Sequence, residues 1–304
     1  MLRRILLASA GATALAGAAF AADLSSRARP PVFFLPPPLI YTWTGPYVGV
    51  NAGYEWSASN TVDVDTANLF NEDSPMAMTY GPGAAAGATG NLPVQTNGFI
   101  GGGQIGYNLQ FGNSWVAGIE ADIQGIAGSN GSATAFTVTP RPGFFPPDTV
   151  ATSLSVTKRI DYLGTLRGRF GFLVMPTLLI YGEGGLAYGG VQSTTSIFGA
   201  EDPFTGSTNF SGAGTSSTSH VGWTAGGGLE WLFAPNWSAK VEYLYYDLGD
   251  VTYGTGPMIT VETLNPIVNF INQSRTTTRF NGNVVRAGLN YHFNLGAAPI
   301  IAKY

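Results

Sequence analysis

Residues Asn283 to Phe293 carry the clearest fold signal in the chain and read Asn-Val-Val-Arg-Ala-Gly-Leu-Asn-Tyr-His-Phe. Their side chains fall into two alternating sets: apolar Val285, Ala287, Leu289, Tyr291 and Phe293, and polar or small Arg286, Gly288, Asn290 and His292. A β-strand sends successive side chains to opposite faces, so this segment has one apolar face and one polar, charged face. That pattern is typical of a strand between lipid and a polar lumen.

A strand of a soluble sandwich alternates similarly over one segment, so the number of repeats decides between the two folds. Seven more segments repeat the pattern: Tyr47 to Trp56, Gly98 to Gln110, Trp115 to Ile126, Lys158 to Leu173, Leu179 to Val191, Val221 to Phe233, and Trp237 to Asp247. Bacterial barrels have an even number of strands. The sequence therefore predicts an all-β fold, an eight-stranded antiparallel transmembrane β-barrel.

The connections between these segments alternate in length. Three are tight turns, at Phe111 to Ser114, Val174 to Thr177 and Ala234 to Asn236. Four are long and rich in Gly, Ser, Thr, Asn and Pro: Ser57 to Asn97, Ala127 to Thr157, Gln192 to His220, and Leu248 to Phe280. Long structureless loops are uncommon in compact soluble domains. Short periplasmic turns with long extracellular loops are typical of a spanning barrel.

Aromatic residues mark both ends of nearly every segment. On the short-turn side they are Tyr47, Phe111, Trp115, Phe170, Phe172, Trp231, Trp237, Tyr291 and Phe293. On the long-loop side they are Trp56, Phe99, Tyr162, Tyr188, Trp223 and Tyr245. We interpret the two groups as the aromatic girdles of the two membrane interfaces.

The other face of the strands carries charges, which the alternation directs into the lumen beside Gln104 and Asn108. This predicted lumen charge network consists of Glu120, Asp122, Arg167, Arg169, Glu183, Glu230, Lys240, Glu242 and Arg286. Opposed residues of an antiparallel hairpin have a constant index sum. On that basis Glu230 is expected opposite Lys240, and Arg167 opposite Glu183. Ion pairs facing the core of a soluble sandwich would be expensive, which favours the barrel.

Composition excludes several classes of protein. The 304-residue chain has no long apolar run after its first two dozen residues, which excludes a helical membrane protein. It has no cysteine, so disulfides, a lipoprotein anchor and cysteine metal sites are excluded. A formal net charge of −4 argues against a nucleic-acid partner.

The chain divides into three parts. Residues 1–21 are predicted to be a signal peptide, with Arg3 and Arg4 before an apolar run and Ala19-Phe20-Ala21 as the cleavage site. Residues 22–42 form a proline-rich periplasmic tether. Residues 43–304 form the outer-membrane β-barrel domain.

Little in the sequence suggests catalysis. The run from Gly101 to Gly106 has dinucleotide-binding spacing but lies within a predicted strand, so we reject that function. Of the two histidines, His292 lies at the periplasmic end, and His220 has Ser216, Ser217 and Ser219 nearby without a defined triad. We therefore predict no enzyme activity, no catalytic residues, no cofactor and no metal site.

The outer connections carry charges that could meet lipopolysaccharide. Lys158, Arg159, Arg275 and Arg279 are candidate contacts for its phosphates. Asp63, Asp65, Glu72 and Asp73 are candidates for recruiting divalent cations beside it.

The chain resembles the small outer-membrane proteins of alphaproteobacteria, often labelled porin-family or outer-membrane beta-barrel domain proteins, of the OmpA/OmpX-like eight-stranded type. The resemblance spans nearly the whole mature chain. Its motifs are Trp43-Thr44-Gly45, Gly164 to Arg169, Tyr181 to Gly185, Lys240 to Tyr243, and Arg286 to Tyr291 with Phe293.

The resemblance implies an integral protein of the cell outer membrane that supports envelope integrity. It also implies insertion by the barrel-assembly machinery and contacts of the loops with host or surface ligands. Three functions remain open: a structural or surface-interaction barrel with a largely plugged lumen, a porin passing small solutes, and an outer-membrane lipid-modifying enzyme.

Overall fold

The computed structural model describes residues 41–72, 80–141, 148–201, 209–261 and 268–293. The predicted signal peptide, all of the predicted tether except Tyr41 and Thr42, and the end of the chain after Phe293 lie outside these residues. Among the described residues, no helix combines the length and apolar character needed to cross a membrane.

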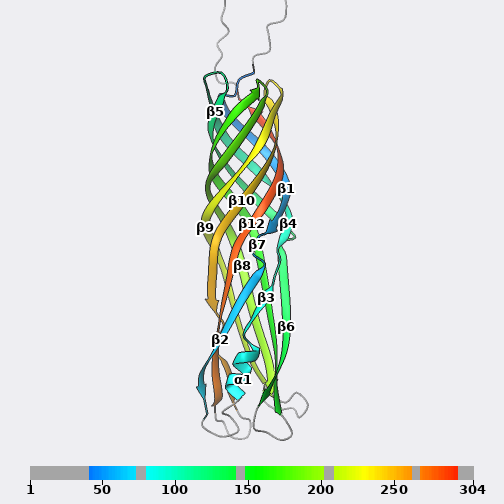
Figure 1. Cartoon of the computed structure of the whole chain (residues 1–304), viewed down its shortest axis with the longest axis vertical. Helices are drawn as coiled ribbons and strands as arrows, with labels where there is room; N and C mark the ends of the chain where they lie inside the picture. Colours follow the sequence, from blue (N-terminus) through cyan, green and yellow to red (C-terminus); the bar gives the residue numbers. More distant parts are fainter. Residues whose placement is uncertain (1–40, 73–79, 142–147, 202–208, 262–267, 294–304) are drawn as a thin grey trace, which may run out of the picture. The chain divides into compact units, whose positions relative to one another are not determined.

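Eight antiparallel strands form a closed ring (Figure 1). In ring order they are β1 (Gly45–Ser57), β4 (Asn97–Phe111), β5 (Trp115–Ala127), β7 (Asp148–Met175), β8 (Leu178–Glu201), β9 (Asn209–Ala234), β10 (Trp237–Gly254) and β12 (Val268–His292). The ring closes because β1 pairs with β12, for example Val50 with Leu289. This confirms the eight-stranded antiparallel fold predicted from the alternation.

Tight turns join the strands at one end of the ring, as predicted. Gly112 has φ of 60° in the turn between β4 and β5, a left-handed conformation that glycine adopts at little cost. Two-residue turns at Pro176-Thr177 and Pro235-Asn236 join β7 to β8 and β9 to β10. We call the part of the ring that contains β1, β4 and β5, with the segments of the other ring strands beside them, the turn-side section.

The four connections that were expected to be long loops are instead largely folded, which corrects the sequence prediction. Strands β7, β8, β9, β10 and β12 continue through them well past the ends of β1, β4 and β5. Further elements pair with or pack against these extensions: β2 (Thr61–Asn71), α1 (Tyr80–Gly87), β3 (Gly90–Pro93), β6 (Asn130–Arg141) and β11 (Met258–Val261). We call this part the loop-side section.

The loop-side section has its own hydrophobic core around helix α1. Its largest side chains are Tyr80, Leu154, Phe210 and Phe270, and the Tyr80 and Phe270 rings meet edge to face with centroids 4.9 Å apart. Small residues let α1 approach the strands closely, since a Cβ at Gly87 would lie 2.6 Å from Oγ1 of Thr152. Segments rich in threonine and serine thus form strands because apolar residues alternate with these polar ones and fill this core.

Outward side chains of the turn-side section are apolar and exposed. Leu166 and Leu289 are 51% and 40% exposed, whereas Thr165 and Gln104 on the opposite face are buried. The predicted orientation of the strands is therefore confirmed. Outward aromatic rings gather near the turns, as in the stacked pair Trp115 and Phe170, and again where the loop-side section begins, as in Tyr54 and Phe99.

Candidate functional site

The candidate site is a layer of charged side chains inside the turn-side section. All nine residues of the predicted lumen charge network are buried there. Five are acidic and four are basic, and they project from β5, β7, β8, β9, β10 and β12. The charged residues that the sequence alternation directs inward thus lie together in one layer.

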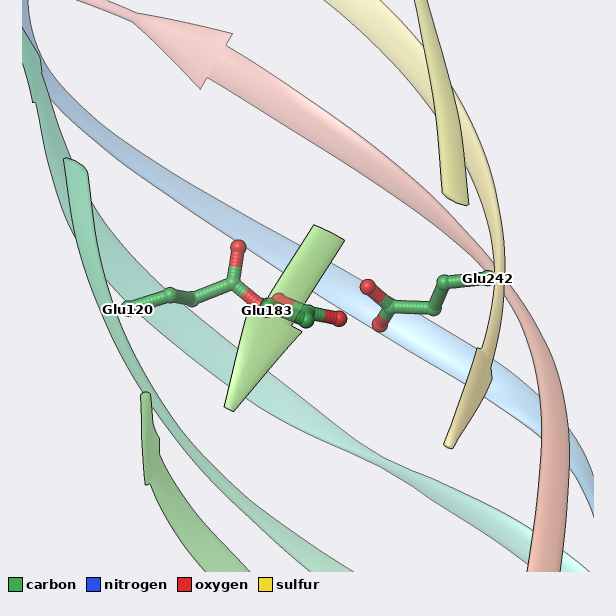
Figure 2. A group of neighbouring side chains, drawn as sticks. All are labelled: Glu120, Glu183 and Glu242. Carbon is green, nitrogen blue, oxygen red and sulfur yellow. The ribbon is translucent and has the colours of Figure 1, made fainter. Parts of the chain in front are cut away.

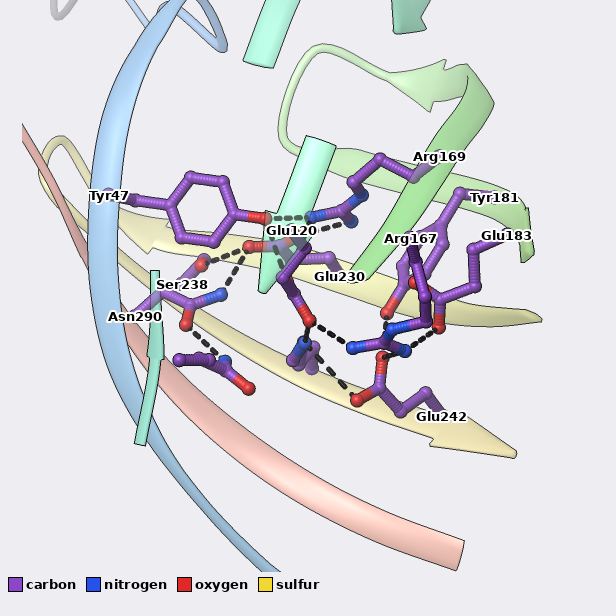
Figure 3. Close-up of polar contacts among 12 residues, drawn as sticks. Tyr47, Glu120, Arg167, Arg169, Tyr181, Glu183, Glu230, Ser238, Glu242 and Asn290 are labelled. Atoms are coloured by element: carbon purple, nitrogen blue, oxygen red, sulfur yellow. Dashed lines mark hydrogen bonds and ion pairs between the residues drawn. The ribbon is translucent and has the colours of Figure 1, made fainter. Parts of the chain in front are cut away.

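Arg167 lies at the centre of the network (Figure 3). Its Nη2 atom contacts Oε1 of Glu120 at 2.6 Å and Oδ2 of Asp122 at 2.5 Å, and its Nη1 atom contacts Oε1 of Glu183 at 2.6 Å. One guanidinium thus joins acids from β5 and β8, the strands on either side of β7. Charge-assisted hydrogen bonds of this length are stronger than neutral ones.

Two further cations complete the centre of the network. The Arg286 guanidinium donates a hydrogen bond from Nη2 to Oδ2 of Asp122 at 2.7 Å and another from Nε to Glu242. Nζ of Lys240 lies 2.7 Å from Oε1 of Glu120 and 3.2 Å from Oε1 of Glu242. Because Lys240 is on β10 and Glu120 is on β5, this contact crosses the lumen between strands that are not neighbours.

A second cluster lies nearer the turns. Arg169 contacts Oε2 of Glu230 at 2.6 Å, and its guanidinium lies 4.0 Å from the ring centroid of Tyr181. The Tyr47 hydroxyl donates a hydrogen bond to Oε2 of Glu120 at 2.7 Å and accepts one from Arg169 at 2.9 Å. The two clusters therefore share Glu120.

The structure corrects the expected position of Tyr47. It was predicted to belong to an outward girdle, but it is fully buried in the lumen. Its alternation with exposed Val48 and Val50 was the sequence signal for this orientation. Further lumen residues were missed as network members. Those that donate to or lie beside its carboxylates include Gln124, Thr165, Tyr181, Ser238, Asn290 and His292.

One predicted pairing has the wrong register. Glu183 lies opposite Arg169, not Arg167, because the β7–β8 hairpin turns at Pro176-Thr177 with an irregularity between Leu173 and Met175. The ion pair between Arg167 and Glu183 forms diagonally instead. Glu230 does lie opposite Lys240 as predicted, although its ion pair at 2.6 Å is with Arg169.

The segment before β1 enters the turn-side mouth of the ring. Trp43 is 1% exposed and packs with Val116, Leu173, Leu179, Tyr181 and Leu232. Its indole Nε1 donates to the carbonyl of Pro176 at 3.0 Å. Since β8 is four strands from β1 in the ring of eight, Trp43 reaches across the lumen to the opposite turn.

Three carboxylates of the network are close enough together to suggest a cation site. Glu120, Glu183 and Glu242 each offer an oxygen within 4.8 Å of the others (Figure 2). Arg167 and Lys240 already contact Oε1 of Glu120, and Arg167 contacts Oε1 of Glu183. Because side-chain cations supply the positive charge, these oxygens fit an ion-pair network better than a metal centre.

The four candidate lipopolysaccharide contacts do not share one environment. Arg159, Arg275 and Arg279 are exposed on the outward surface. Lys158 points inward instead and is 1% exposed, with Nζ 2.5 Å from the carbonyl of Arg279 and 3.2 Å from that of Ser59. The structure therefore contradicts the expected contact of Lys158. Burial lowers the pKa of this ammonium group to about 8, against a smaller opposing effect of Glu55.

The candidate cation-recruiting acids are only partly described. Asp63 and Asp65 are exposed on β2, where Nδ2 of Asn91 donates to Asp63 at 2.6 Å and Asp65 lies opposite Arg275. Glu72 follows β2 and is half-buried, and Asp73 lies outside the described residues.

The two histidines lie far apart in the structure. His220 is on β9 in the loop-side section, opposite Gly189. His292 is buried at the turn-side end, where Nε2 lies 2.9 Å from Oγ of Ser238 and 3.4 Å from Glu230. Within the described ranges, no ion pair joins His220 to a carboxylate.

Comparison with known proteins places this geometry in a family. Residues 6–293 match the family model of the outer membrane protein beta-barrel domain. The chain is 31% identical over 294 residues to the 31 kDa outer-membrane immunogenic proteins of Brucella melitensis and Brucella suis, covering 96% of this chain and 100% of theirs. Among solved structures, OprG of Pseudomonas aeruginosa aligns with 83% of this chain and 99% of its own at 11% identity and a TM-score of 0.35.

Proposed function

Because this chain belongs to the outer membrane protein beta-barrel family, and is thus an integral protein of the cell outer membrane, we propose that it is a closed barrel that serves the envelope as a structural and surface-interaction protein. On this proposal the turn-side section spans the bilayer with a largely plugged lumen. The loop-side section then projects from the cell as a folded surface.

The charge network carries the proposal. The side chains of Arg167, Arg286 and Lys240 are 0% exposed, as are those of the acids they contact. Eight strands enclose an interior that side chains can fill, whereas open aqueous channels belong to barrels of about 16–18 strands. Ion pairs that cross such a narrow lumen leave little room for a continuous path.

Apolar layers on both sides of the network add to this support. Toward the turns lies the cluster around Trp43, and toward the loop-side section lies a cluster that includes Ile160, Tyr246 and Phe280. Beyond it, helix α1 fills the loop-side core. A solute would have to displace several of these layers, so we expect a low conductance.

One observation favours the alternative of a small-solute porin. Several buried polar atoms have no hydrogen-bond partner among the described residues, including both amide atoms of Asn108 and Nε of Arg169. Buried polar groups of this kind are commonly satisfied by water. Linked waters would provide a path for small solutes, so the porin stays as the second candidate.

We propose no enzymatic role. The third function left open by the sequence, lipid modification, would need a nucleophile and a base at the outer-leaflet rim. His220 lies at that end, but Ser219 hydrogen-bonds to Tyr162 at 2.9 Å and no carboxylate in the described part of the chain orients the histidine. The surface function instead predicts that host or surface ligands bind the loop-side section.

Single-channel recording in planar bilayers tests the proposal. We expect little or no steady conductance from the unmutated protein. The double variant Arg167→Ala with Arg286→Ala removes two guanidinium groups that cross the lumen, and it should open a measurable path. A variant carrying Arg275→Ala and Arg279→Ala is the matched control, because both residues are outward, and it should remain closed. A large ohmic conductance from the unmutated protein would favour the porin.

A further inference from the structure

The outward surface of the turn-side section contains an apolar hollow of about 370 Å³. Small Gly103 and Ala121 lie at its floor, and Ile105, Ile123 and Tyr188 of β8 also line it. Gln104 and Asp122, whose side chains are buried on the lumen face, complete the lining. The Tyr188 ring reaches β5 because it lies over Gly164, where a Cβ would be only 2.2 Å from the ring. Small residues at the floor thus leave a space that faces the hydrocarbon of the bilayer.

A second hollow, of about 360 Å³, lies farther out on the same side of the ring. Its lining is mostly polar and comes from β6, β7 and β8. Asn130, Ser132, Thr157, Arg159 and Gln192 have outward positions there, and Gly131 and the buried Lys158 complete the lining. Arg159 contacts Asp161 through Nε at 2.8 Å. The remaining guanidinium N–H groups can donate a bidentate pair of hydrogen bonds to a phosphate. Asp161 does not line the hollow.

Strand register aligns the two hollows. Tyr188 is opposite Gly164, which is opposite Ile123, and these three form a row across the apolar hollow. Gln192 is opposite Arg159, which is opposite Asn130, and these form a row across the polar hollow. Four residues of β8 separate the rows, a distance of roughly 13 Å along the strand.

We propose that the two hollows together form one binding site for lipopolysaccharide, the phosphorylated glycolipid of the outer leaflet. Arg159 binds a headgroup phosphate, and one acyl chain lies against Gly103 and Ala121 beside Tyr188. The amide and hydroxyl side chains around Arg159 match the hydroxyl groups of a sugar, which favours a glycolipid over a phospholipid. The proposal depends on the outer-membrane location and is independent of whether the lumen conducts.

Native mass spectrometry of the refolded full chain in detergent tests this site. The protein is incubated either with a deep-rough lipopolysaccharide of defined acylation or with phosphatidylglycerol, and the fraction that keeps one bound lipid is measured. Arg159→Gln removes the phosphate contact. Gly103→Leu fills the apolar hollow, and a Cβ there would meet only the carbonyl of Gly49 at an ordinary 3.8 Å.

Matched controls are Arg275→Gln, an outward arginine on β12, and Ala225→Leu, an outward residue on β9 away from both hollows. We expect each test variant to lower lipopolysaccharide retention at least tenfold and each control to stay within twofold of the unmutated protein. Heat-modifiable migration on a denaturing gel verifies that every variant is folded. Equal retention by test and control variants, no retention by the unmutated protein, or equal retention of phosphatidylglycerol would each overturn the proposal.

Discussion

The turn-side and loop-side sections share the long strands β7, β8, β9, β10 and β12 but have opposite polarity. On β7 of the turn-side section, Arg167 points into the lumen and Leu166 points outward. On the same strand in the loop-side section, Leu154 is buried inside while Ser153 and Ser155 have outward positions. On the proposed function, the first section is surrounded by lipid and the second by water. Alternation therefore indicates a strand, but the surrounding solvent decides which set of side chains faces inward.

Breaking the polar interior of the turn-side section should have the largest effect. Arg167→Ala leaves Glu120, Asp122 and Glu183 without their shared cation, and breaking a buried pair in this way costs about 3–5 kcal/mol. We expect the midpoint of urea unfolding in lipid vesicles to fall accordingly. Arg275→Ala, which removes an exposed arginine, should change it by less than about 1 kcal/mol. Similar losses in both variants would contradict a special role for the buried network.

Breaking the apolar interior of the loop-side section should have a comparable but local effect. Tyr80→Ala removes a ring that packs on Phe210 and Phe270, and large-to-small aromatic substitutions in cores cost about 3–5 kcal/mol. We expect faster proteolysis of the loop-side section, while the heat-modifiable species of the turn-side section persists.

Deleting residues 61–92 tests more directly whether the loop-side core can be lost while the ring stays folded. This segment lies in the first connection that the sequence predicted to be a long loop, but it contains β2, α1 and most of β3. We now expect its deletion to expose the rest of the loop-side core to protease and to leave the eight-stranded ring heat-modifiable. Loss of the heat-modifiable species would mean that the two sections do not fold separately.

Placing a charge on the outer surface of each section should distinguish a lipid-facing surface from a water-facing one. Leu166→Arg puts a cation on the lipid-facing surface and should cost about 2–4 kcal/mol. Ser196→Arg puts the same charge on an exposed position of β8 in the loop-side section, where it should be nearly neutral. Folding yields in lipid vesicles measure the difference. Equal yields would show that the boundary between the sections has been placed wrongly.

The buried ammonium group of Lys158 should make the loop-side boundary sensitive to alkaline pH. Burial lowers its pKa from 10.5 to about 8, so between these values the unfolded chain holds a proton that the folded chain has released. Stability therefore rises as pH increases from 8 to 10.5, by about 3 kcal/mol. Lys158→Met should lack this increment in urea unfolding measured across that pH range. An identical pH profile for both proteins would contradict the assignment.

Patterns of neighbouring residues predicted the eight ring strands, the three tight turns and the inward direction of the nine charged residues. These features follow from alternation and turn chemistry, which are properties of neighbouring residues. The loop-side strands could not be predicted, because their segments are rich in Ser, Thr and Gly. The apolar residues that alternate with these form a core only when α1 and the strand extensions pack together.

The remaining contacts depend on how distant parts of the chain pack together. Trp43 crosses to a turn of the opposite strands, and Lys240 reaches an acid on a strand that is not its neighbour, so neither contact follows from local spacing. A β-bulge between Ile160 and Tyr162 reverses the faces of β7, which is why Lys158 points inward and Arg159 outward. Alternation alone could not place these two residues, because a single extra residue in a strand inverts the orientation of every side chain beyond it.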